Sequence, residues 1–232
     1  SWNKIPIGRR LIHLGEGPMW LVVRPNIWHL KPYRCARDDY SQGILLDANE
    51  NAFGPALASS MLPATTTTST SVLENHHLAR YPDPHQLPLK TQFAHWRIGP
   101  NGSANQVFVG VGSDEVLDLV MRVFGTPQVD KILTCPPTYG MYAISAAIND
   151  LDIVSVPLLS ADSMFQLNLP LILHTLQSDP RIKLVFLCSP GNPTGSYLNM
   201  ADIQAILDGF HHGIVIVDEA YIDFVEGYDL YG

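Results

Sequence analysis

The sequence predicts an α/β fold in which a mainly parallel sheet carries helices on both faces. Apolar runs typical of strands alternate with segments of helical periodicity from residue 106 onward. The 232 residues are 46% hydrophobic and 16% charged, which suffices for one sizeable core and argues against extensive disorder. Polar and glycine-rich motifs follow the strand-like runs, where parallel α/β sheets bind their ligands.

The region before residue 106 lacks this alternation. Residues 1–45 carry scattered prolines and aromatic residues, and we expect an irregular arm or part of a small domain there. Residues 46–232 are predicted to form a large domain. Within it, the Ser- and Thr-rich residues 64–72 are low in complexity and are expected to form a surface insertion.

Five strands and four helices are predicted to alternate from residue 106. The first helix shows the pattern most plainly, because its apolar side chains recur every three or four positions until Gly125 ends it. The predicted strands are residues 106–112, 131–135, 152–158, 183–190 and 213–221. The predicted helices are residues 113–125, 138–150, 169–177 and 200–212.

Charge and cysteine content exclude several classes of protein. The net charge is −8 and no run of Lys or Arg occurs, so neither nucleic acid nor a membrane surface is an expected partner. The apolar runs are shorter than the ~20 residues that span a bilayer. Three well-separated cysteines favour a reducing compartment, which here predicts the cytoplasm. Because residue 1 is Ser, the N-terminus is expected to be incomplete.

A glycine-rich turn at residues 110–114 has the geometry of a phosphate site. Gly110 and Gly112 would let the backbone approach an anion, and the N–H groups of Gly112, Ser113 and Asp114 would face it at a helix N-terminus. A tight turn capped by Ser113 explains the same residues. A dinucleotide site is disfavoured because Glu115 stands where a third glycine is needed.

The loop at residues 188–198 places one amide at a strand end. Pro190 and Pro193 stiffen the chain around Asn192, directly after an apolar run. An ordinary turn is the alternative, but such dense Pro and Gly punctuation favours a loop that holds the Asn192 amide rigidly.

Asp218 ends the last apolar run, and a carboxylate at the mouth of a buried sheet needs a positive partner. That partner could be an arginine, a metal ion or a protonated ring nitrogen of a cofactor. A metal site is disfavoured because no histidine lies nearby at helical spacing. Tyr221, three residues later, could direct its hydroxyl to the same ligand.

Together these motifs resemble a known enzyme family. In chain order they read KPYRCAR, LDANENAFGP, RYPDPH, GVGSDEVLDL, CPPTYGMY, SPGNPTG and VDEAYIDF. They resemble the fold-type I aminotransferases, which use pyridoxal 5′-phosphate, and within these the histidinol-phosphate aminotransferase branch. SPGNPTG is shared by many aminotransferases, whereas LDANENAFGP, RYPDP and PPTYGMY are more specific to the branch.

The resemblance implies roles around the cofactor ring. Asp218 would pair with the protonated pyridine nitrogen, so that the ring can accept electrons. Asn192 and Tyr221 would bind the ring 3′ oxygen, and Tyr139 would stack on the ring face. Ser113 and Asp114, which follow Gly112, would give backbone N–H groups to the cofactor phosphate, with the Asp114 side chain turned away.

The resemblance also implies residues that act on the substrate or across subunits. Tyr81 would reach the cofactor phosphate of a neighbouring subunit, which implies a homodimer. Tyr33 and Asn49 are candidates for lining the substrate pocket. The implied reaction is transamination between L-histidinol phosphate and 2-oxoglutarate, which yields glutamate.

One departure from the family is large. The Schiff-base lysine and the substrate-binding arginines of the family are expected in sequence that would follow residue 232, together with a small C-terminal domain. The chain is therefore expected to be the amino-terminal part of such an enzyme, and to be inactive alone. A related pyridoxal-phosphate enzyme is an alternative, either an aromatic amino-acid aminotransferase or a phosphate-ester decarboxylase. Another alternative is a non-catalytic ligand-binding fragment.

Overall fold

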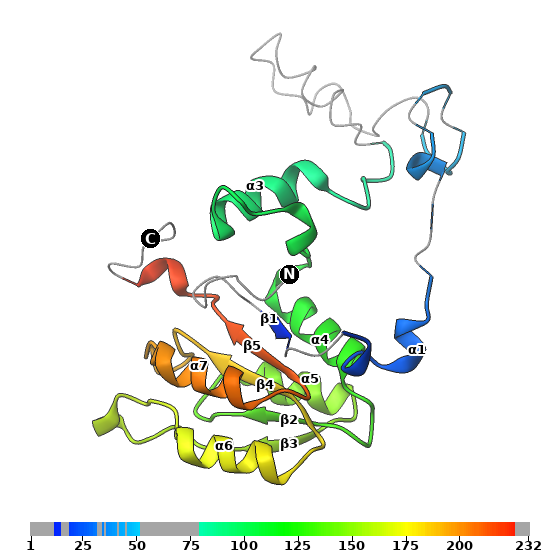
Figure 1. Cartoon of the computed structure of the whole chain (residues 1–232). Coiled ribbons are helices and arrows are strands. Elements are labelled where there is room, and N and C mark those ends of the chain that lie inside the picture. Colours follow the sequence, from blue (N-terminus) through cyan, green and yellow to red (C-terminus); the bar gives the residue numbers. More distant parts are fainter. Residues whose placement is uncertain are drawn as a thin grey trace. The chain divides into compact units, whose positions relative to one another are not determined.

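The computed structural model describes residues 12–14, 19–31, 34, 36–40, 42–44, 46–51 and 79–225 (Figure 1). The chain divides into two compact units, each described here by itself. The sheet unit comprises Ser1–Leu30 and Phe93–Gly232, and the second unit comprises Lys31–Gln92. Tyr33 and the predicted insertion at residues 64–72 lie outside the described residues. The predicted boundary near residue 45 stays a prediction.

The described residues of the sheet unit form a five-stranded sheet of order β1-β5-β4-β2-β3. The strands are β1 (Ile12–Leu14), β2 (Lys131–Thr134), β3 (Asp152–Ser155), β4 (Ile182–Cys188) and β5 (Ile214–Asp218). Strands β2 to β5 run parallel, and β1 pairs antiparallel with β5, with Ile12 opposite Ile216. The predicted mainly parallel sheet is confirmed.

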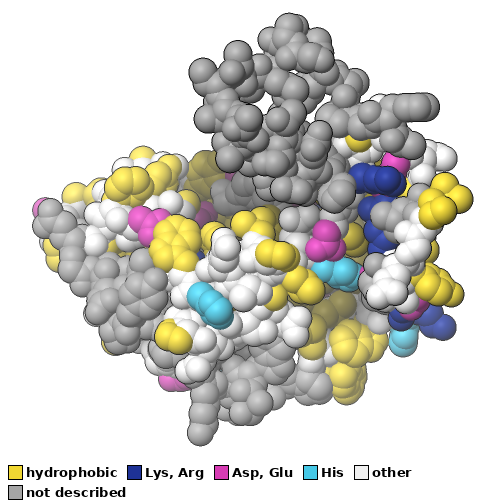
Figure 2. All heavy atoms as spheres, turned by 90° about the horizontal axis from the view of Figure 1, so that it is seen from above, with side chains coloured by type: hydrophobic (Ala, Val, Ile, Leu, Met, Phe, Trp, Pro, Cys, Tyr) yellow, Lys and Arg dark blue, Asp and Glu magenta, His cyan; other side chains and the backbone are white. Residues whose placement is uncertain are grey.

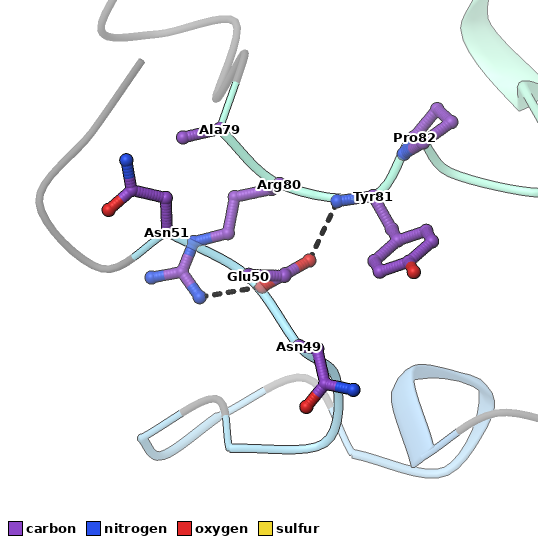
Figure 3. A pocket seen from close by; sticks show the side chains of 7 residues that line it. All are labelled: Asn49, Glu50, Asn51, Ala79, Arg80, Tyr81 and Pro82. Carbon is purple, nitrogen blue, oxygen red and sulfur yellow. Dashed lines mark hydrogen bonds and ion pairs between the residues drawn. The ribbon is translucent and has the colours of Figure 1, made fainter. Parts of the chain in front are cut away.

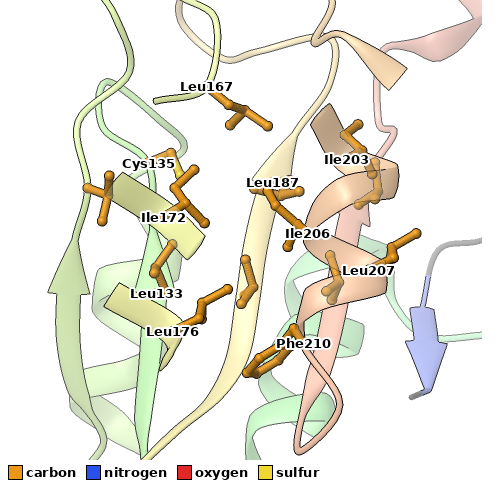
Figure 4. Packing of buried hydrophobic residues seen from close by; sticks show 14 of the residues in the cluster. Leu133, Cys135, Leu167, Ile172, Leu176, Leu187, Ile203, Ile206, Leu207 and Phe210 are labelled. Carbon is orange, nitrogen blue, oxygen red and sulfur yellow. The ribbon is translucent and has the colours of Figure 1, made fainter. Parts of the chain in front are cut away.

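Helices cover both faces of this sheet, as predicted (Figure 1). On one face, α4 (Gly112–Phe124) and α5 (Met141–Ile148) pack on Phe186 and its neighbours. On the other face, α6 (Leu169–Ser178) and α7 (Met200–Gly209) enclose a second core around Leu187 (Figure 4). The other helices among the described residues are α1 (Pro25–Trp28), α3 (Leu87–Ile98), and the short 3-10 turns Met19–Leu21, Ala36–Asp38, Ala104–Gln106, Ala161–Ser163 and Ile222–Phe224.

The strand predicted at residues 106–112 is wrong. Residues 107–111 have no regular structure, and the side chains of Phe108 and Val111 are 64% and 86% exposed. Local polar bonds hold the backbone before this segment, because Ser103 and Gln106 form a reciprocal capping box. The fifth strand of the sheet is instead β1, which lies within the arm that was predicted to be irregular.

Strand alternation explains which side chains reach the carboxyl end of the sheet on the α4 and α5 face. Phe186 in β4 and Ile216 in β5 belong to the core under these helices. Because side chains two residues apart share a face, Cys188 and Asp218 continue the same two rows. The register pairs these last two residues with each other. A thiol and a carboxylate therefore lie side by side where the two central strands end.

The surface of the described residues retains large apolar side chains in contact with solvent. Figure 2 shows hydrophobic side chains exposed in several places on one face, interspersed with polar surface. Among the described residues, none of the helices combines the length and hydropathy needed to cross a bilayer.

Candidate functional site

Asp218 is half-buried at the end of β5, and both of its carboxylate oxygens accept hydrogen bonds. The Tyr142 hydroxyl donates to Oδ2 at 2.6 Å, and the Ala220 N–H donates to Oδ1 at 3.2 Å. Both donors are neutral, and within the described parts of the chain Asp218 forms no ion pair with Lys, Arg or His. The carboxylate is thus oriented without being neutralised.

Tyr142 lies in the first turn of α5 and is 1% exposed. Its ring packs against Phe186 with centroids 5.2 Å apart. Burial raises the pKa of the Tyr142 hydroxyl, and the negative charge of Asp218 adds to the shift. The hydroxyl therefore stays protonated and remains a donor to Asp218 at neutral pH.

Tyr139 precedes α5 and connects this centre to α4. Its hydroxyl donates to Asp114 Oδ1 at 3.1 Å, and this bond raises the Tyr139 pKa. Its ring stands edge-on to that of Tyr142, with centroids 5.6 Å apart. The Asp114 side chain is accordingly turned toward Tyr139.

The N-terminus of α4 begins with the predicted glycine turn. Gly112 has a φ of +72°, and its N–H donates to the Gly110 carbonyl at 3.0 Å. The Glu115 carboxylate accepts from the Val111 N–H. A Cβ on Gly110 would come within 2.9 Å of both Val116 and Glu115, so glycine is needed there for close approach. The Gly112 N–H is thus bonded within the turn. A helix supplies no internal acceptor for the N–H groups of its first turn, and those of Ser113 and Asp114 belong to this turn.

The loop after β4 carries Asn192, which is half-buried. The loop contains cis peptide bonds before Pro190 and Pro193. Three hydrogen bonds close it, from Gly191 N to Ser196 O, from Gly195 N to Gly191 O, and from Leu198 N to Ser189 Oγ, at 2.9, 2.8 and 3.0 Å. The Ser189 N–H also donates to the Asp218 carbonyl at 3.0 Å, so the loop begins beside Asp218.

Tyr221 is exposed in the turn that follows Asp218, and a salt bridge holds this turn. Arg97 donates from both terminal nitrogens to Asp223, at 2.7 and 2.6 Å, and its guanidinium lies 4.0 Å from the centroid of the Trp96 ring. Arg97 and Asp223 are 126 residues apart in the chain, so no local pattern in the sequence could have indicated this contact.

Sequence reasoning assigned no role to Tyr142 or Glu219. Tyr142 follows Tyr139 by three residues, which places both on one side of a helical turn, so this spacing was a usable signal. Glu219 follows Asp218 directly and is half-buried, and burial raises its pKa to about 7. Nothing in the sequence distinguishes this half-buried glutamate from an ordinary surface glutamate.

The second unit contains Asn49 and Tyr81, which line an open pocket of about 260 Å³ (Figure 3). Glu50 organises this pocket and has a side chain that is 4% exposed. It accepts from Arg80 Nη1 at 2.8 Å, from the Tyr81 N–H at 2.7 Å and from Arg37. These bonds, that to Arg37 foremost, lower the Glu50 pKa to about 2. The Tyr81 side chain is 62% exposed.

The sequence matches the family model of aminotransferase class I and II over residues 41–231. The chain belongs to the class I and II aminotransferases. Curated relatives include the histidinol-phosphate aminotransferases of Candida maltosa, 48% identical over 215 residues, and Saccharomyces cerevisiae, 44% identical over 216 residues. These alignments cover 88% and 89% of this chain but 52% and 53% of the relatives. This aminotransferase chain thus spans about half the length of the curated relatives it matches.

Solved aminotransferase structures support the fold. The histidinol-phosphate aminotransferase of Sinorhizobium meliloti, solved in complex with pyridoxal-5′-phosphate, superposes with a TM-score of 0.55 at 22% identity. The match covers 76% of this aminotransferase chain and 44% of that structure. At this identity the likeness establishes the shared architecture of sheet and helices.

Proposed function

We propose that this chain forms the pyridoxal-phosphate-binding part of a histidinol-phosphate aminotransferase. The observation that carries the proposal is the Asp218 carboxylate, which is half-buried at the carboxyl end of a central parallel strand and held there by two neutral donors. A carboxylate in such a place suits a cationic ligand, because burial without a positive partner is costly.

The residues present fit this cofactor. Asp218 would hold the proton on the ring nitrogen, and Tyr139 would cover the ring face. Asn192 and Tyr221, from the loops that follow β4 and β5, would bind the ring 3′ oxygen. The N–H groups of Ser113 and Asp114 lie in the first turn of α4, where backbone donors and the helix dipole favour a phosphate.

The chemistry that the cofactor supplies when bound is an electron sink for the substrate α-carbon. The chain's contribution is electrostatic and geometric. An ionised Asp218 keeps the ring nitrogen protonated, because loss of that proton would leave a half-buried carboxylate without a positive partner.

The substrates and assembly are part of the proposal. Relatives 44% and 48% identical to this chain are named histidinol-phosphate aminotransferases, which supports histidinol phosphate as substrate. We assign 2-oxoglutarate as the amino acceptor. Tyr33 and Asn49 are assigned to the substrate pocket. Tyr81 is assigned to the cofactor phosphate of a second subunit in a homodimer, and its exposure leaves it accessible for such a contact. We place the protein in the cytoplasm.

Substitution of Asp218 by alanine tests the proposal. We expect the Asp218→Ala chain to bind pyridoxal phosphate about 10- to 100-fold more weakly than the wild type, because a charge-assisted hydrogen bond contributes about 1.5–3 kcal/mol. Cofactor fluorescence and absorbance titrations measure this affinity. Asp152→Ala is the matched control, because it removes an exposed carboxylate at the amino end of β3. This variant should bind the cofactor as the wild type does. Equal affinity of wild type and Asp218→Ala would refute the site.

A protein that contains this chain and spans the length of the curated relatives tests the reaction. Asp218→Ala should lower its turnover of histidinol phosphate by on the order of 10²–10³-fold, more than it weakens cofactor binding, because the ion pair acts chiefly in the transition state. Assays with histidinol phosphate and with an aromatic amino acid, each against 2-oxoglutarate, decide the substrate. Preference for the aromatic amino acid would retain the cofactor site and overturn the proposed substrate.

A further inference from the structure

The Tyr142 hydroxyl is the only side-chain donor to Asp218 among the described residues, and Tyr142 is not one of the residues proposed to touch the cofactor. It reaches Asp218 Oδ2 at 2.6 Å from a side chain that is almost fully buried. The ring of Tyr142 packs on Phe186, and a phenylalanine would fill the same space. Hydrophobic packing therefore explains the ring but not the hydroxyl.

We propose that Tyr142 is a positioning residue, whose hydroxyl holds the Asp218 carboxylate in the orientation that receives the protonated ring nitrogen of the cofactor. The inference rests on the proposed function. Tyr142 acts through Asp218, and it extends the site beyond the residues that touch the cofactor.

The geometry at Asp218 supports a role in orientation. Tyr142 donates to one carboxylate oxygen and the Ala220 N–H to the other, so rotation of the carboxylate would break both bonds. A carboxylate oxygen can accept two hydrogen bonds, so each oxygen retains one lone pair for a ligand. Without the hydroxyl, one donor remains, and the carboxylate can turn about its terminal bond.

The surroundings of the hydroxyl favour the same assignment. Cys188 is the other polar side chain beside it, and the negative charge of Asp218 acts on both. Burial raises the pKa of the Cys188 thiol, so this group is neutral near pH 7. The Cys188 thiol itself donates to the Pro190 carbonyl at 3.5 Å. Asp218 is therefore the anionic acceptor toward which the Tyr142 hydroxyl is directed.

The test compares two ligands that differ at one atom. Pyridoxal phosphate carries the ring nitrogen, and its carbocyclic analogue has a C–H group in place of that nitrogen and cannot donate to Asp218. We expect Tyr142→Phe in the 232-residue chain to weaken binding of pyridoxal phosphate about three- to tenfold. The same substitution should leave the affinity for the analogue unchanged within about twofold, because the hydroxyl acts only through Asp218 and the ring nitrogen.

A double-substitution cycle completes the test. Tyr142→Phe added to Asp218→Ala should cause no further loss of affinity, since the acceptor through which Tyr142 acts is already gone. Tyr40→Phe, which removes an exposed hydroxyl, is the control and should bind both ligands as the wild type does. Circular dichroism and thermal unfolding establish that each variant is folded.

The outcomes separate this inference from the proposed function. Equal weakening of both ligands by Tyr142→Phe would show that the hydroxyl serves packing, which overturns the inference alone. Unchanged affinity for both ligands would also overturn it. Failure of the wild-type chain to prefer pyridoxal phosphate to the analogue would overturn the proposed function, and the inference with it.

Discussion

Glu50 illustrates how strongly one side chain can depend on its partners. Its carboxylate accepts from Arg37, Arg80 and the Tyr81 N–H, and its pKa falls to about 2 from an ordinary value of 4.5. A carboxyl group with a lowered folded-state pKa stabilises the fold above its unfolded-state pKa, and this stabilisation is lost as pH falls through the folded-state pKa. The second unit should therefore lose stability between about pH 4.5 and pH 2.

Glu50→Gln tests this dependence. The variant should be less stable than the wild type at pH 6, because two arginines lose their shared anionic partner, and its stability should change less between pH 4.5 and pH 2. The backbone amide NMR signals of residues 79–81, followed through an acid titration, report the loss of structure. Asp39→Asn removes an exposed partner of Arg34 and is expected to behave as the wild type does. A Glu50→Gln profile that parallels the wild type would contradict the assignment.

The position of a single residue could be predicted from the sequence where it depends only on the neighbouring strand. Asp218 ends one apolar run and Asn192 follows another, so the sequence predicted a strand end for Asp218 and the loop after a strand for Asn192. The partners of these residues were not predicted, because Tyr142 reaches Asp218 across 76 positions and Arg97 reaches Asp223 across 126. Such contacts depend on how the helices pack, and the residues around each partner in the sequence do not indicate this packing.

At the level of elements, the junction between α7 and β5 depends on Gly213. A Cβ at Gly213 would lie 2.3 Å from the Lys183 carbonyl oxygen and 2.4 Å from the Phe210 ring. The carbonyl belongs to β4, so the clash cannot be relieved by a side-chain rotation. Gly213 therefore permits the close approach with which β5 enters the sheet.

We expect Gly213→Ala to lower the free energy of unfolding by about 1–3 kcal/mol, the usual cost of forcing atoms into a packed interior. Urea unfolding followed by circular dichroism measures this change. Gly140→Ala is the matched control, since a Cβ there meets nothing within 4 Å and the residue precedes α5 in a helical conformation. A Gly213→Ala variant as stable as Gly140→Ala would show that the strand shifts freely to accommodate the methyl group.

Elements with a clear period were predicted, and those without one were missed. Helix α4 was recognised because its apolar residues recur with helical spacing. Helix α3 was not, because Phe93 and Trp96 remain exposed and Ala94 is its one buried residue. The run at residues 106–112 is apolar enough to suggest a strand, but in the described structure it finds no neighbouring strand.

At the level of the whole molecule, alternation of strands and helices determined the fold class correctly. The antiparallel strand β1 escaped prediction because three residues carry too little pattern to distinguish a strand from a loop. The proposed cofactor site agrees with the fold, since the loops after β2, β4 and β5 begin at the same edge of the sheet.

The opposite edge of the sheet holds the lysines of the sheet unit that the structure describes. Lys131 opens β2 and pairs with Asp179 at 2.8 Å, and Lys183 lies near the start of β4 and donates to the His212 carbonyl at 3.2 Å. A strand rises about 3.3 Å per residue, so the four steps from Ile214 to Asp218 place Asp218 about 13 Å from the amino end of β5. Lys31 and Lys90 belong to the second unit, and Lys4 lies outside the described residues.

We therefore expect the 232-residue chain to bind pyridoxal phosphate without a stoichiometric covalent link and without transaminase turnover, because a lysine must be desolvated beside the cofactor to act as nucleophile and proton carrier. Borohydride reduction of the chain with cofactor, followed by mass spectrometry of its peptides, should give scattered labelling below one group per chain. Asp218→Ala should lower the bound cofactor without changing that pattern. Stoichiometric labelling of a single lysine, together with glutamate-dependent turnover, would contradict this expectation. It would place one of the chain's five lysines, either Lys4 or one of the other four, beside the ring.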